Sequence, residues 1–139
     1  MNILIIDGQG GQLGAQLVKE ISSRFDGVTL TAVGTNAVAT ASMLKAGAKN
    51  AATDENPVAV ACRRADVIIG PIGIVIADSM LGEVTPGMAL AVAQSSAKRI
   101  LIPMNRCDNL VAGVTQTATA FLIEDALDKL NAVINGQNA

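Results

Sequence analysis

The sequence predicts an α/β protein, a three-layer α/β/α sandwich around a parallel five-stranded sheet. Two observations lead to this prediction. Short, continuous apolar runs rich in β-branched residues alternate with longer helix-like segments along the whole chain. Several of these runs end directly in glycine, as strands that lead into turns do. Regular alternation of this kind implies right-handed crossovers and a sheet covered on both faces.

The first elements follow from residue spacing. Residues 2–7 form a buried strand, and residues 13–25 form an amphipathic helix with its apolar positions four apart. Asp26 and Gly27 end this helix, and residues 28–33 return as a strand closed by residues 34–36. The opening segment is therefore strand, glycine loop, helix, strand.

The same alternation continues to the end. Helices are expected over residues 37–45, from the cap Asn56 to about Arg64, from the cap Thr85 to about Ser95, and over residues 119–134. Strands are expected over residues 48–52, 67–70 and 99–103, and residues 109–115 are a candidate for a short edge strand. The predicted strand order is 3-2-1-4-5, which is Rossmann-like or flavodoxin-like, in a single domain spanning residues 1–139.

Composition limits the function. Half of the 139 residues are apolar, 16% are charged and the formal net charge is −2, which argues against a disordered protein and against nucleic-acid binding. The uncharged run of residues 67–77 is too short to span a membrane. We expect a cytoplasmic protein. The high apolar fraction also suggests a partner-covered surface, most simply in a homo-oligomer. With no histidine or tyrosine, imidazole and phenol catalysis is excluded.

The glycine loop after the first strand is the main candidate site. It follows a strand and opens a helix, as a phosphate-binding loop must, and amides at a helix N-terminus favour an anion. The strict G-x-G-x-x-G pattern fails, although a G-x-x-G-x-x-G pattern fits; a tight turn whose glycines serve geometry alone is the alternative. The predicted phosphate-binding residues are Gly8, Gln9, Gly10, Gly11, Gln12, Leu13 and Gly14.

Three other groups follow predicted strands and should meet the loop at the carboxyl edge of the sheet. Polar residues in the third group could hold a phosphate or carboxylate, and Cys107 beside them could have a lowered thiol pKa, although a polar surface loop is the alternative. The predicted additions to the cofactor site are Thr35 and Asn36, then Gly70, Pro71 and Gly73, then Asn105 and Arg106.

Two resemblances accompany these motifs. The loop Gly8–Gly14 resembles the phosphate loop of extended short-chain dehydrogenase/reductases. The chain as a whole resembles a family of small bacterial Rossmann-like proteins catalogued as a domain of unknown function. This second likeness rests on residues 6–11, 32–36, 43–48, 65–78 and 102–107. It implies the fold and no established activity.

The leading hypothesis is a protein that binds a phosphate-bearing small molecule, a nucleotide or dinucleotide, with NAD or NADP first. The acidic residue expected about 20 positions after the loop to hold the adenosine ribose is missing, and Thr35 and Asn36 occupy its place. A non-catalytic homo-oligomeric assembly protein is the alternative, and an FMN carrier is less favoured because aromatic flanks are lacking. Asp78, Ser79 and Glu83 could form a metal pair, a lid or a capped helix start. We favour the helix start and predict no metal site. Catalytic residues and the roles of Asp7, Asp78 and Cys107 stay open.

Overall fold

The computed structural model describes residues 1–104, 108–115 and 118–137. All five strands run parallel in the order β3-β2-β1-β4-β5, which confirms the predicted topology. The elements in chain order are β1 (Asn2–Asp7), α1 (Gln12–Arg24), β2 (Thr29–Gly34), α2 (Ala37–Lys45), β3 (Asn50–Thr53), α3 (Glu55–Arg64), β4 (Val67–Pro71), the short 3-10 helix η1 (Ile72–Val75), α4 (Pro86–Gln94), β5 (Lys98–Ile102) and α5 (Thr119–Ile134).

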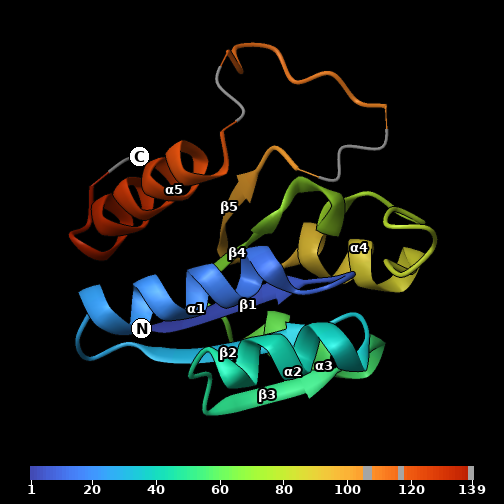
Figure 1. Ribbon diagram of the computed structural model, residues 1–139, viewed down its shortest axis with the longest axis horizontal. Helices are drawn as coiled ribbons and strands as arrows, with labels where there is room; N and C mark the ends of the chain where they lie inside the picture. Colours follow the sequence, from blue (N-terminus) through green and yellow to red (C-terminus); the bar gives the residue numbers. More distant parts are fainter. Residues whose placement is uncertain (105–107, 116–117, 138–139) are drawn as a thin grey trace.

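Helices cover both faces of the sheet (Figure 1). One apolar core joins α1, α2 and α5 to one face, and a second joins α3 and α4 to the other. The central strand β1 contributes to both cores in alternation, with Ile3 and Ile5 on one side and Leu4 and Ile6 on the other. This burial on both faces explains why β1 reads as an uninterrupted apolar run.

The predicted helix starts are partly correct. Thr85 caps α4 through its side chain, which accepts from the Met88 amide, and Pro86 opens the helix as expected. The predicted cap of α3 is wrong: the cap is Asp54, whose carboxylate accepts from the Glu55 amide two residues before the expected cap Asn56. Residues 109–115 form no strand, so that expectation is also wrong.

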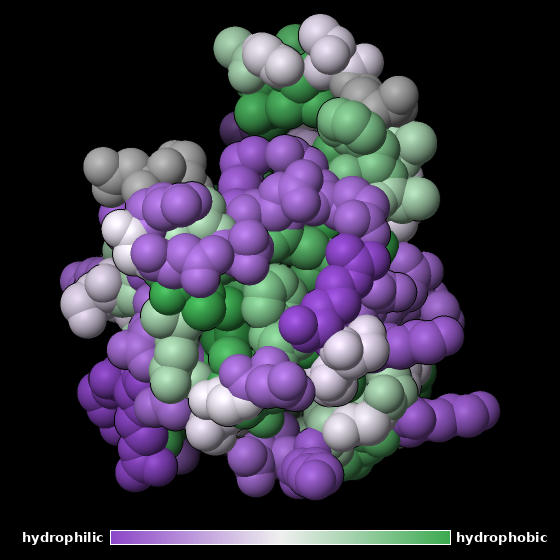
Figure 2. Space-filling view, turned by 90° about the vertical axis from the view of Figure 1, so that its left-hand side faces the viewer, coloured by the Kyte–Doolittle hydropathy of each residue, from purple (hydrophilic) through white to green (hydrophobic). Residues whose placement is uncertain are grey.

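The amino ends of the strands form the face seen in Figure 2, where a central apolar band is framed by hydrophilic residues. Lys49, Asn50 and Arg64 line a groove that runs between α3 and the β2–β3 part of the sheet. The glycine loop lies at the opposite, carboxyl end of the sheet, as the parallel topology requires. No helix in the described part of the chain is long and apolar enough to cross a membrane.

Candidate functional site

The glycine loop connects β1 to α1 beside the point where the strand order reverses, between β1 and β4. Most of its amides already have partners within the protein. The amides of Gly8 and Gly14 donate to the carboxylate of Asp7, and the Gly11 amide donates to the Gly8 carbonyl. Among the described residues, the Gln12 and Leu13 amides at the start of α1 have no hydrogen-bond acceptor. An anion that bound these two amides would therefore displace no partner within the protein; Gln12 is exposed, whereas the Leu13 residue is 6% exposed.

The carboxylate of Asp7 holds the glycine loop through hydrogen bonds to its backbone. Asp7 is 3% exposed, and its two oxygens accept from Gly8 N at 2.8 Å and Gly14 N at 2.7 Å. Burial raises the pKa of this carboxyl; the two amide bonds lower it and the charge of Glu83 raises it, leaving the pKa above its ordinary value. Asp7 thus ties the end of β1 to the first turn of α1.

The loop glycines are required for close packing. A Cβ on Gly14 would lie 2.8 Å from the Asp7 Cβ, so the glycine lets α1 approach β1. Gly11 has a φ of +73°, and a Cβ there would lie 2.7 Å from the Ala39 Cα. Gly10, by contrast, is exposed and has open space around it. Geometry alone therefore accounts for Gly11 and Gly14, and leaves Gly10 unexplained.

Glu83 is the residue that the sequence interpretation missed. Its Oε1 accepts three hydrogen bonds, from Gln9 N at 2.8 Å, Thr35 Oγ1 at 2.8 Å and Asn36 Nδ2 at 2.6 Å. Burial raises the pKa of Glu83, but the bonds from Gln9, Asn36 and Thr35 together outweigh it and hold the pKa below its ordinary value. A charged carboxylate thus lies where β1 and β2 end.

Glu83 belongs to a compact segment, residues 76–85, between η1 and α4. The Asp78 amide donates to the Val84 carbonyl, and the Val84 amide donates back to the Ser79 carbonyl. The buried Ser79 hydroxyl donates to the Gly73 carbonyl, and the Thr85 hydroxyl donates to Glu55. Asp78, Ser79 and Glu83 do not start a helix, so that interpretation is wrong; the segment is a turn that ends at the cap Thr85.

The turn contains unfavourable backbone conformations. Asp78, Met80 and Leu81 all have positive φ, at 65°, 56° and 57°. Left-handed conformations cost non-glycine residues roughly 1–2 kcal/mol each. The turn retains them because Met80 and Val84 are buried in the core, while Leu81 at its tip is 99% exposed. This segment therefore holds Glu83 in one position.

The structure brings together the loop, Thr35 and Asn36, as the parallel topology predicts. Asn36 also donates to the Gln9 carbonyl and accepts from the Ala39 amide, so it links the loop to the start of α2. The three predicted residues at the end of β4 and in η1 are less available to a ligand. Gly70 is packed against the backbone of β1, with a Cβ position 2.3 Å from the Ile6 oxygen, and Pro71 and Gly73 are buried. Asn105, Arg106 and Cys107 lie outside the described residues.

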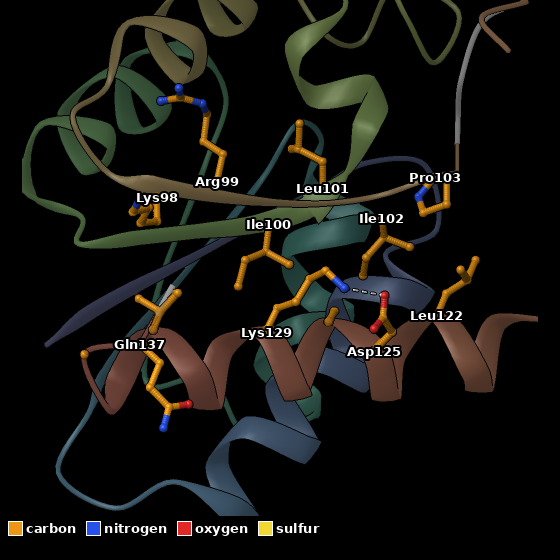
Figure 3. A pocket seen from close by; sticks show the side chains of 13 residues that line it. Lys98, Arg99, Ile100, Leu101, Ile102, Pro103, Leu122, Asp125, Lys129 and Gln137 are labelled. Atoms are coloured by element: carbon orange, nitrogen blue, oxygen red, sulfur yellow. Dashed lines mark hydrogen bonds and ion pairs between the residues drawn. The ribbon is translucent and has the colours of Figure 1, made fainter. Parts of the chain in front are cut away.

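Three surface grooves lie away from the glycine loop. The groove between β5 and α5, about 530 Å³, has Ile100 and Ile102 pointing toward α5 and Arg99 pointing away (Figure 3). The others lie between α3 and the β2–β3 part of the sheet, about 800 Å³, and between α3 and α4, about 640 Å³. The switch-point site is thus a polar surface rather than one of these hollows. Within the described ranges, no three His, Cys, Asp or Glu side chains group as metal ligands would.

The comparisons with known proteins identify a family. A family model with the description "Domain of unknown function (DUF3842)" matches residues 2–135. The solved structures that match include a dodecameric FMN-dependent UbiX-like decarboxylase from Escherichia coli O157:H7, at 13% identity and a TM-score of 0.48, over 94% of this chain and 95% of that one. No curated protein is significantly similar in sequence. These matches add no support to the short-chain dehydrogenase resemblance of the loop.

Proposed function

The chain belongs to the family described as a domain of unknown function (DUF3842), and we propose that it binds a nucleotide or dinucleotide at the carboxyl edge of its sheet. The observation that carries the proposal is the pair of unpaired amides, Gln12 and Leu13, at the start of α1. The Gly10 amide likewise has no acceptor among the described residues, whereas the other loop amides are paired with Asp7, Glu83 or the Gly8 carbonyl. A phosphate group on these two amides would meet both the N–H groups and the positive end of the α1 dipole.

The proposed ligand needs a sugar as well as a phosphate. Thr35 and Asn36 lie at the end of β2, where a Rossmann-like sheet holds the adenosine ribose. NAD and NADP are the first ligands to test for this reason. Gly10, which is exposed and unhindered, gives such a ligand access to the loop backbone.

The proposal is tested by thermal unfolding with NAD, NADP, FAD, FMN, ATP, GTP and S-adenosylmethionine. A ligand at 100 times its Kd adds about 2.7 kcal/mol of stability, which is readily visible. Gln12→Glu is the diagnostic variant, because a carboxylate in the first turn of α1 supports the helix dipole while repelling a bound phosphate. Gln16→Glu makes the same change on another exposed residue, one turn farther along. We expect weaker binding in Gln12→Glu alone; the absence of any stabilising ligand for the unmodified protein refutes the proposal.

A second candidate function, self-assembly, is favoured by the open edge of the sheet. Among the described residues, β5 pairs only with β4. Two β5 strands in antiparallel register about Ile100 would place Lys98 and Arg99 of one copy opposite Ile102 and Leu101 of the other, so like charges would not face each other. An unpaired edge with this pattern is suited to strand addition by a second copy.

Sedimentation velocity tests this assembly. We expect a dimer at micromolar concentration. Leu101→Lys would place a second cation opposite Arg99 and dissociate the dimer, whereas Leu90→Lys, on the exposed side of α4, would not. A monomer throughout the concentration range refutes the assembly.

A further inference from the structure

We propose that Glu83 is the acceptor for a ribose diol in the nucleotide site and that it selects against nucleotides with a 2′-phosphate. This inference rests on the proposed function. It assigns to the turn at residues 76–85 a role that β2 fills in other Rossmann-like sheets, where an acidic residue about 20 positions after the glycine loop holds the ribose hydroxyls. No acidic residue follows β2 here, since Thr35 and Asn36 occupy that place.

The first support is position. Glu83 accepts its three hydrogen bonds from Gln9, the second residue of the glycine loop, and from Thr35 and Asn36, which follow β2. A carboxylate that contacts both of these segments lies at their junction. The chain thus brings an acidic group to the end of β2 from a segment 48 residues away.

The second support is the state of the two oxygens. Oε1 is occupied by Gln9, Thr35 and Asn36, whereas Oε2 has no hydrogen-bond partner among the described residues. One oxygen therefore fixes the carboxylate and the other is left to accept from a ligand. The free Oε2 can accept a hydrogen bond from a sugar hydroxyl. It disfavours a phosphate, because the negative charges of a carboxylate and a phosphate in contact repel each other.

The third support is rigidity. The Glu83 amide donates to the Met80 carbonyl, and the surrounding turn is closed by the paired bonds of Asp78, Ser79 and Val84. Ordering this carboxylate upon binding would cost little, because its position is set before the ligand arrives. The Gln12 and Leu13 amides are not among the groups that hold Glu83, so a phosphate and a ribose would use different groups of the site.

Isothermal titration with NAD and NADP tests the inference on the full chain, using Glu83→Gln and the control Asp78→Asn. Asp78 is an exposed carboxylate in the same turn, and its side chain makes no hydrogen bond that holds the site. We expect NAD to bind at least about tenfold more tightly than NADP, and Glu83→Gln to reduce this preference about tenfold by weakening NAD. Asp78→Asn should leave the preference unchanged.

The remaining outcomes separate the two proposals. Equal binding of NAD and NADP with no effect of Glu83→Gln overturns the diol inference and leaves the nucleotide site in place. Tighter binding of both ligands and of inorganic pyrophosphate to Glu83→Gln also overturns it, because Glu83 would then be occluding an anion site. Failure of the unmodified protein to bind NAD, NADP, ADP and pyrophosphate overturns the proposed function and the inference together. Circular dichroism of each variant excludes loss of fold.

Discussion

The carboxylate of Asp7 accepts from the amide of Gly14 at 2.7 Å, and this one bond joins the last residue of β1 to the first turn of α1. The other oxygen of Asp7 accepts from the Gly8 amide, so both ends of the glycine loop are held by a single buried side chain. The carboxylate accepts hydrogen bonds from two amides of the loop, as a bound anion would in a phosphate-binding turn.

Removing Asp7 should therefore destabilise the fold. In Asp7→Ala, the Gly8 and Gly14 amides lose their acceptors in a buried place, at an expected cost of about 1–3 kcal/mol each in free energy of unfolding. Asp7→Asn keeps one acceptor and should lose less. Urea unfolding measures both, with the exposed Asp26→Asn as a control. Equal stability of Asp7→Ala and the unmodified protein would contradict this role.

The glycines of the loop should differ sharply from one another. Gly14→Ala adds a methyl group 2.6 Å from the Met43 sulfur and 2.8 Å from the Asp7 Cβ, and overpacking of this kind typically costs about 1–3 kcal/mol. Gly10→Ala has open space around its Cβ, so we expect little change. The urea concentrations at the midpoint of unfolding of Gly14→Ala and Gly10→Ala, compared with that of the unmodified protein, measure this difference in stability. Comparable midpoints for both variants would show that α1 does not depend on this close approach.

The charge of Glu83 should make stability depend on pH. Its pKa is lowered in the folded protein relative to its ordinary value of 4.5, so the unfolded chain binds more protons in the acid range. The stabilisation is fully present above pH 4.5 and is lost as the pH falls through the folded pKa. The gap in unfolding free energy between the unmodified protein and Glu83→Gln should therefore shrink from pH 7 to pH 3. A gap that widens toward acid would contradict the hydrogen bonds to Glu83.

Cys62 should be unreactive. It lies on α3 and is 3% exposed, and burial raises the pKa of its thiol to about 11, so very little thiolate is present at neutral pH. In a Cys107→Ser variant, a disulfide reagent at pH 7.5 should label the native protein negligibly and the urea-unfolded protein fully. Rapid labelling of native Cys62 would contradict its placement.

The sheet could be predicted from the sequence because its signals are local. The apolar run of residues 2–7 indicates a strand by its own composition, and Thr85 followed by Pro86 indicates a helix start. The cap of α3 was predicted two residues too late because Asp54 and Asn56 are both good cap residues; the structure uses Asp54, with a φ of +86°. The turn at residues 76–85 was misread because three of its residues adopt left-handed conformations that their side chains do not signal.

The candidate site was predicted in outline and missed in its most informative residue. The topology alone brings the glycine loop beside Thr35 and Asn36. Glu83 could not be assigned in the same way, because its partners lie 47, 48 and 74 residues away and the strained turn decides where it points. One signal was present: Rossmann-like sheets carry an acidic residue near the end of β2, and none follows β2 in this sequence.

The central claim concerns two backbone groups, the amides of Gln12 and Leu13, and amide NMR observes both directly. Titration of the ¹⁵N-labelled protein with ADP, followed by NAD, should shift these two resonances most strongly, with smaller changes at Gln9 and Gly10. Gln12→Glu should suppress the shifts and Gln16→Glu should not. Saturating ligand that leaves both resonances unmoved, or that shifts residues of the β5–α5 groove instead, would contradict the account.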